Sequence, residues 1–179
     1  MACLLTDGIL KGCRDNIGGI DKVWLTNLEH ISAITYGTGI LTALSTQNPL
    51  GTSAASFYEF QPNKTSSNWT DTISVVASNG GTFYAPSVTL VFGKLEAAKA
   101  NTIKLMGQGT LVCLVKNNDG KYFILGDTKG LEVSAGAGAS GVAYTDLNGW
   151  TITLTGAEDH PAYEVPSALM TSSILLPAV

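Results

Sequence analysis

Short stretches in which apolar and polar residues alternate recur along most of the chain. Alternation with a period of two is the pattern of a half-buried strand. Runs rich in Gly, Pro, Asn, Asp and Ser separate these stretches and predict turns, with the longest loops over 45–55 and 62–68. The low-complexity run SAGAGASG at 134–141 predicts a mobile or tightly turned segment. The pattern predicts strands at 23–28, 31–36, 40–44, 57–61, 111–116, 121–125, 131–133 and 150–155.

The longest pair of alternating runs predicts a β-hairpin over residues 70–92. Its first run places Ile73 and Val75 on one face, and a Ser-Asn-Gly-Gly turn signal separates it from the second run. Pro86 interrupts the second run. Because proline lacks a backbone N–H, we expect a sheet edge or a bulge at that position.

A second hairpin is predicted around Asp119-Gly120, a pair typical of type I′ turns. The stretch 94–106 is the single candidate for a helix, and Gly107 is well placed to end it. The predicted buried face of this helix consists of Leu95, Ala98, Thr102 and Met106, with Ile103 and Leu105 flanking it.

About eight to ten strands and one helix in 179 residues predict a single, mainly β domain. We expect a two-sheet β-sandwich or barrel with one flanking α-helix at about 94–106. Residues 1–20 have few side chains to pack and predict an extended N-terminal arm, and 156–179 predict a proline-punctuated C-terminal tail.

Charged residues make up only 13% of the chain, and the net charge is −4. This charged share is about half the usual one for a soluble domain, so we expect partners to cover much of the surface. No cluster of Lys and Arg suggests nucleic-acid binding, although an acidic surface suits DNA that must pass without adhering. No apolar run is long enough to span a membrane, and the N-terminal segment lacks the basic start of a signal peptide.

The side chains that carry catalysis or bind metals are sparse, so we expect neither an enzyme nor a cofactor. The three cysteines are expected to be reduced thiols, with a Cys3–Cys13 bond left open as an alternative. His30 is interpreted as a residue on a strand face, and the sequence Glu-Asp-His at 158–160 as an exposed charged turn. A calcium loop at 146–149 would lack most of its ligands, so no metal site is expected.

The three tryptophans lie mostly in predicted strands, where core packing explains them. Trp69 is the exception, because it is expected to lie in a polar loop, next to Asn68. A large aromatic ring is costly to expose. We therefore expect a neighbouring subunit to bury Trp69.

Five segments in this order and spacing resemble the major tail tube proteins of tailed bacteriophages. The resemblance covers residues 1 to about 165. The segments are CRDNIGGI at 13–20 with VWL at 23–25, the stretch 57–92, the helix candidate 94–106, NDG at 118–120 with FILG at 123–126, and DLNGWTITL at 146–154.

This resemblance implies a structural protein of the virion, assembled in the host cytoplasm. Its subunits would form rings, usually hexameric, that stack into a tube together with other tail proteins. Double-stranded DNA would pass through the lumen without specific binding. The candidate residues for contacts between subunits are Phe57, Tyr58, Phe60, Trp69, Ile73, Val75, Phe83, Tyr84, Val88 and Leu90.

Two other classes of protein fit the same sequence. One is another virion component, such as a capsid decoration protein or a head–tail connector. The other is a sandwich-type binding module for a carbohydrate or a cell surface, which would be a monomer with an exposed aromatic platform. The form of assembly distinguishes the three.

Overall fold

The computed structural model describes residues 8–10, 17–47, 56–76, 78, 80–170 and 175–176. These residues form twelve strands, one α-helix and two short 3₁₀ turns, so the protein is mainly β as predicted. The strands are β1 (Ile20–Asn27), β2 (Ile31–Tyr36), β3 (Leu41–Thr46), β4 (Phe57–Phe60), β5 (Asn68–Val76), β6 (Gly81–Gly93), β7 (Leu111–Asn117), β8 (Tyr122–Leu125), β9 (Leu131–Ala139), β10 (Gly149–Gly156), β11 (Tyr163–Val165) and β12 (Leu175–Leu176). The helix α1 is Ala97–Met106, and the 3₁₀ turns are Leu28–His30 and Ser167–Leu169.

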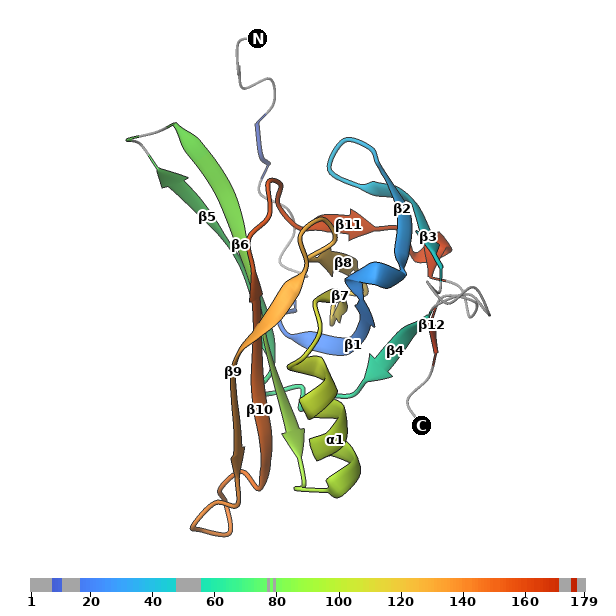
Figure 1. Cartoon of the computed structure of the whole chain (residues 1–179). Helices are drawn as coiled ribbons and strands as arrows, with labels where there is room; N and C mark the ends of the chain where they lie inside the picture. The colour runs from blue at the N-terminus through green and yellow to red at the C-terminus, as the bar shows by residue number, and fades with distance from the viewer. Residues whose placement is uncertain are drawn as a thin grey trace.

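Ten strands form one continuous sheet in the order β12-β4-β1-β7-β9-β10-β6-β5, with β8 and β11 branching from β7. Strands β7 and β9 pair only at Leu111 and Leu131, so the sheet folds over at this point into two layers. One layer is β9-β10-β6-β5 and the other contains β1, β4, β7 and β8 (Figure 1). The hairpin β2–β3 forms a small second sheet.

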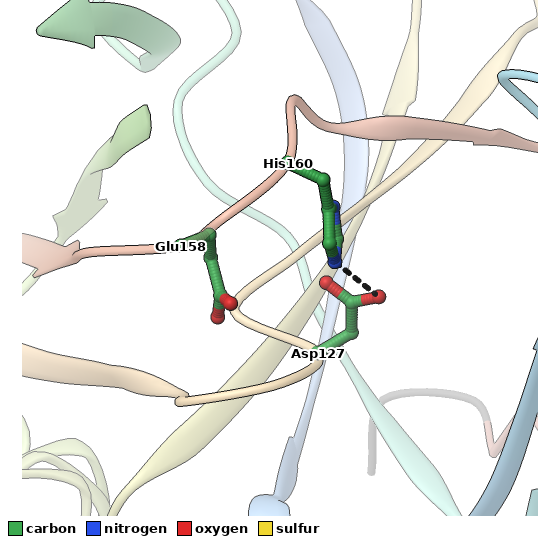
Figure 2. Close-up of side chains that lie close together, drawn as sticks. All are labelled: Asp127, Glu158 and His160. Atoms are coloured by element: carbon green, nitrogen blue, oxygen red, sulfur yellow. Dashed lines mark ion pairs between the residues drawn. The ribbon is translucent and has the colours of Figure 1, made fainter. Parts of the chain in front are cut away.

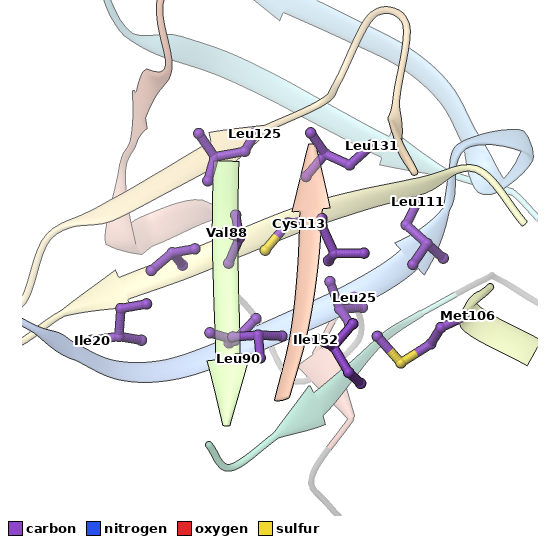
Figure 3. Close-up of a cluster of buried hydrophobic side chains, with 13 residues drawn as sticks. Ile20, Leu25, Val88, Leu90, Met106, Leu111, Cys113, Leu125, Leu131 and Ile152 are labelled. Carbon is purple, nitrogen blue, oxygen red and sulfur yellow. The ribbon is translucent and has the colours of Figure 1, made fainter. Parts of the chain in front are cut away.

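Two clusters of buried side chains lie on opposite faces of β1 and β7. The first fills the space between the two layers and includes Leu25, Cys113, Leu90 and Ile152 (Figure 3). The second contains Trp24 and lies on the other face, towards β2–β3 and β11. A strand that is buried on both faces needs apolar residues at successive positions, which explains the run LVCLV in β7.

The Gly- and Ala-rich run at 134–141 is a strand over most of its length, so the prediction of a mobile or tightly turned segment is wrong. Strand β9 pairs with β10 along its whole length, apart from one bulge. Its small side chains let the indole of Trp150 lie against Gly138, where a β-carbon would come within 2.9 Å of the ring. Small residues fit in β9 because the large Trp150 side chain of the neighbouring strand β10 fills the space beside them.

The helix α1 lies where the sequence predicted it and ends at Gly107, but only part of its predicted buried face meets the core. Met106 is buried and Ile103 packs on the first cluster, whereas the predicted positions Leu95, Ala98 and Thr102 are exposed. Alanines on several sides of the helix leave little contrast between its faces, so the apolar pattern did not define the buried one.

The turn at Asp119-Gly120 differs from the predicted type I′ geometry. Only Gly120 takes a positive φ, of 86°, and its N–H donates to the carbonyl of Asn117. This is a type I turn with a glycine bulge, the usual three-residue hairpin connection. It still joins β7 and β8 as the sequence predicted.

Pro86 lies inside the sheet, because β6 is flanked by β5 and β10. It faces Asp71 of β5 and comes one residue beyond Ser87, the last position at which β6 pairs with β10. Its missing N–H therefore falls where the ladder to β10 is interrupted. The expected edge or bulge is replaced by this interruption.

Each predicted terminal extension contains residues that belong to strands of the fold. Ile20, placed in the arm, is a buried residue of β1, and most of 1–16 lies outside the described residues. The predicted tail contributes β11, which pairs with β8, and β12, which pairs in parallel with β4. Val165 of β11 is buried in the second cluster.

Candidate assembly surfaces

The hairpin β5–β6 extends beyond the two-layered core (Figure 1). Its tip carries exposed apolar side chains. Ile73 is 62% exposed and Val75 68% exposed on the face that, further along the strand, packs on the core through Trp69. Phe83 is 38% exposed on the opposite face. Three large apolar side chains near one tip are typical of a contact surface.

The outer edge of β5 has no partner strand among the described residues. Along a strand, the N–H and C=O groups of successive residues point alternately to one neighbouring strand and to the other. The N–H and C=O groups of Tyr84 both bond to Glu158, at 2.8 Å each, on the side of β6 where β10 lies. The even residues of β6 therefore face β10 and its odd residues face β5. In the register of β5 with β6, Ile73 pairs with Tyr84 and Val75 with Thr82, so both direct their N–H and C=O groups to the open side.

Strand β9 has a second open edge at the other end of the same layer. Beyond Leu131 it pairs only with β10 among the described strands. The same alternation directs the N–H and C=O groups of Gly136 and Gly138 away from β10. Neither β5 nor β9 carries Lys or Pro, the residues that commonly prevent such edges from pairing.

Away from the hairpin tip, where Val76 and Phe83 lie, the outer face of the layer β9-β10-β6-β5 carries mainly hydroxyl and small side chains. Asp71 and Glu132 are the only charged residues of these four strands, and Lys and Arg do not occur in them. The register places these residues of the outer face side by side: Thr70, Thr72, Ser74, Ser87, Thr89, Thr151, Thr153, Thr155, Ala135 and Ala137.

The structure divides the ten predicted contact residues into two groups. Phe57, Val88 and Leu90 are completely buried in the chain's own core, so they have no surface for a second subunit and are no longer candidates. The remaining seven have accessible surface. They are Tyr58, Phe60, Trp69, Ile73, Val75, Phe83 and Tyr84.

Trp69 lies in β5 rather than in a loop, and its partners belong to its own chain. Its indole N–H donates to Oδ1 of Asn117 at 2.8 Å, and its ring lies 5.2 Å from that of Phe123. The expectation that it needs a neighbouring subunit for burial is therefore corrected. Its partners are 48 and 54 residues away in the chain (117 − 69 and 123 − 69), beyond the reach of a local pattern.

A groove of about 830 Å³ separates the helix from β1 and β4. Tyr58, which is 54% exposed, and Leu105, which is 60% exposed, both line it. Tyr58 was among the predicted contact residues, whereas Leu105 was placed beside the predicted buried face of the helix and not among them.

Asp127, from the turn between β8 and β9, meets Glu158 and His160, from the segment between β10 and β11, which corrects the expectation of an exposed turn at 158–160 (Figure 2). Glu158 is only 2% exposed, and Asp159 alone is largely exposed. Burial raises the pKa of the Glu158 carboxyl, and the neighbouring Asp127 raises it further. The hydrogen bonds that the carboxylate accepts from the N–H groups of Lys129 and Thr128 act in the opposite direction and lower the pKa. Partial burial, with these carboxylates beside the phenol, raises the pKa of Tyr36 to about 12.

The other side chains considered for chemistry have structural roles. His30 lies in the 3₁₀ turn after β1, not on a strand face, and contacts the hydroxyl of Thr26 at 3.1 Å. Cys113 is a free, buried thiol whose pKa is raised by burial, whereas Cys3 and Cys13 lie outside the described residues. Asp146 accepts the N–H groups of Val142 and Ala143.

Comparisons with known protein families, curated proteins and solved structures gave no match. In the described part of the chain, no helix has the length and apolar character needed to cross a membrane.

Proposed function

We propose that this chain is a structural subunit that assembles with copies of itself into stacked rings, forming the tail tube of a tailed bacteriophage. The observation that carries the proposal is a pair of open strand edges, β5 and β9, at opposite ends of one four-stranded layer. The resemblance of five sequence segments to tail tube proteins supplies the biological context.

A second copy of this chain is the partner that fits these edges best. When two different edges of one molecule pair head to tail, each added subunit offers a new open edge, so the contact generates a ring or a filament. The backbone groups of β5 would then be satisfied by β9 of the next subunit. The apolar tip residues Ile73, Val75 and Phe83 would be buried at the same contact.

In a closed ring of such layers, one face of β9-β10-β6-β5 would surround the lumen. The inner face packs on the first core cluster, which leaves for this position the outer face, where Glu132 is the one charged residue and Lys and Arg do not occur. A surface of hydroxyl groups without Lys or Arg offers DNA no cations to neutralise its phosphates. Such a lining suits a conduit through which DNA slides.

Electron microscopy of the purified, concentrated protein, with one edge variant, tests the proposal. Gly136→Pro removes an N–H that points away from β10, so the strand retains its ladder but its outer edge is blocked. We expect hollow tubes or stacked rings for the wild type and for Gly136→Ala, and monomers for Gly136→Pro. Circular dichroism checks that the proline variant is folded.

A second variant blocks the opposite edge. Ile73→Lys with Val75→Lys places two charges on side chains that are already exposed, so we expect a folded monomer that does not assemble. Closed rings that never stack would instead support a connector, and a monomer at high concentration would support a binding module. Tubes formed by both edge variants would contradict edge pairing.

A further inference from the structure

The cluster of Asp127, Glu158 and His160 contains a buried carboxylate oxygen that has no partner. Oε1 of Glu158 accepts hydrogen bonds from the N–H groups of Lys129 and Thr128, at 2.9 and 3.3 Å. Oε2 is buried and has no hydrogen-bond partner among the described residues. An unpaired buried oxygen of this kind costs free energy, so a group that is absent from the protein alone is expected beside it.

A second buried oxygen without a partner belongs to a residue that lines the same cavity. Oδ2 of Asp71 accepts the N–H of Ala162 at 2.9 Å, whereas Oδ1 is buried without a partner. Asp71, Asp127, Glu158 and His160 all line one small cavity, which has no room for a water molecule. Three carboxyl groups around a space that excludes water call for a compact cation.

We propose that Asp127, Glu158 and His160 bind one divalent transition-metal ion of the zinc type. This inference does not rest on the proposed function. Each residue offers one ligand atom, and these atoms all lie within 4.8 Å of one another. Ligands of one zinc ion lie at about 2.0–2.2 Å from it, and so at most about 4.4 Å apart. Binding therefore draws the three side chains together by a few tenths of an ångström.

The imidazole is already oriented for a metal. Nδ1 of His160 lies 3.0 Å from the carbonyl oxygen of Pro161. Because a carbonyl only accepts, Nδ1 carries the proton, and the lone pair of Nε2 points towards Asp127, 3.8 Å away. Thr128 Oγ1 also lies 3.2 Å from Nε2, and binding exchanges this contact for the metal. A backbone carbonyl that fixes the tautomer is the usual support of a histidine ligand.

Tyrosines form the surroundings of the three ligands. The hydroxyl of Tyr36 donates to Oδ2 of Asp127 at 2.8 Å, and the ring of Tyr163 stacks on the imidazole with the centroids 4.6 Å apart. Hydrogen bonds to ligating carboxylates and apolar walls are typical of built metal centres. Imidazole favours zinc and its neighbours over magnesium and calcium, which prefer sites made only of oxygen.

A bound ion would fasten the base of the β5–β6 hairpin. Glu158 pairs with Tyr84 of β6 through two hydrogen bonds of 2.8 Å, and Asp127 lies in the turn between β8 and β9. The ion would link the turn between β8 and β9 directly to the segment between β10 and β11. We therefore expect zinc to raise the thermal stability of the protein as well as to bind.

Titration calorimetry with ZnCl2 and thermal melting test the proposal in a Cys3→Ser/Cys13→Ser background, which removes the thiols outside the described residues. We expect one zinc ion per chain, a higher melting temperature, and no comparable effect of Mg²⁺ or Ca²⁺. Glu158→Gln and His160→Asn should each weaken zinc binding by about tenfold or more. His30→Gln, which removes the other histidine, is the matched control and should bind zinc like the parent.

A measurement on the parent protein keeps the proposal testable if a variant does not fold. Nitrogen NMR of the imidazoles should show the Nε2 resonance of His160 shift on addition of zinc, while Nδ1 keeps its proton and His30 is unchanged. Absence of zinc binding by the parent, or equal binding by Glu158→Gln and His160→Asn, would overturn the proposal.

Discussion

At the scale of single residues, the contact between Gly138 and Trp150 gives the sharpest prediction for stability. A β-carbon on Gly138 would lie 2.9–3.1 Å from three ring atoms of Trp150, whereas one on Gly136 would meet only the carbonyl oxygen of Thr151 at 4.0 Å. We expect Gly138→Ala to be less stable than Gly136→Ala by about 1–3 kcal/mol, because the indole must move. Urea unfolding of the two variants measures this difference, and equal stabilities would contradict it.

Asp21 gives a second prediction, on the dependence of stability on pH. Its carboxylate pairs with Lys64 of the 61–67 loop and, at 3.2 Å, with Lys116 of β7. The hydrogen bond to Lys64, supported by Lys116, lowers the pKa of Asp21 below its usual value. A lowered pKa in the folded state means that the pair stabilises the fold above the unfolded pKa of about 3.9, and that this contribution is lost as the pH falls through the folded pKa.

We therefore expect Asp21→Asn to destabilise the protein by about 0.5–1 kcal/mol at pH 7, and by much less once the wild-type carboxyl is protonated. Urea unfolding of both proteins at neutral pH and near pH 2.5 provides the measurement. Asp119→Asn, in an exposed turn, is the control for a lost negative charge. A difference that persisted unchanged in acid would exclude the ion pairs as its source.

The residues that sequence analysis misjudged have partners far away in the chain. Trp69 was placed in a loop because a polar segment precedes it, yet its hydrogen-bond partner Asn117 is 48 residues away. Glu158 was assigned to an exposed turn, yet the N–H groups that hold it belong to residues 128 and 129. Charged residues near a turn are usually exposed, and only the tertiary contacts reverse this for Glu158.

At the scale of elements, strands were predicted well where apolar and polar residues alternate and poorly where they do not. Strands β6 and β10 follow their alternation closely, with Val88 and Ile152 buried. Strand β9 was missed beyond Val133, because glycine and alanine give no contrast between faces. The boundaries of α1 were predicted within three residues, but its buried face was not.

The helix yields a matched pair of substitutions. Ile103 packs on the first core cluster, whereas Leu105, two residues on, is 60% exposed. We expect Ile103→Ala to lower the free energy of unfolding by about 1–2 kcal/mol, less than for a fully buried isoleucine, because Ile103 is only half-buried. The free energy of unfolding of Leu105→Ala should stay within about 0.5 kcal/mol of the wild-type value. Denaturant unfolding of the monomer compares them. A larger loss for Leu105→Ala would show that the helix turns a different face to the core.

At the scale of the whole molecule, the mainly β class and the flanking helix were predictable, because composition and periodicity carry them. The order of strands was not, since β7 follows β6 and α1 in the chain but pairs with β1, far away in the sequence. This order is what leaves β5 and β9 at opposite ends of one layer. The two open edges could therefore be recognised only from the fold, and the proposed assembly depends on them.

The same layer leads to a prediction about DNA. Its outer face has no Lys or Arg, so we expect tubes or monomers of the wild type not to bind double-stranded DNA measurably, even at low salt. Thr153→Lys places one cation per subunit at the centre of this face, where Thr153 of β10 pairs with Thr89 of β6. Binding should then appear and weaken steeply with salt, with a slope that rises by about 0.9 for each phosphate neutralised.

Fluorescence anisotropy of labelled DNA across a salt series measures both proteins. Thr102→Lys is the matched control, because it adds the same charge to an exposed position on α1, away from the four-stranded layer. If the outer face surrounds the lumen, assembly brings the lysines at 153 from all subunits together around one axis. DNA binding by Thr153→Lys should then be stronger than DNA binding by Thr102→Lys. It should weaken when Gly136→Pro prevents assembly. Equal binding by the two lysine variants would place this face on the outside of the assembly, and salt-sensitive DNA binding by the wild type would contradict an inert lining.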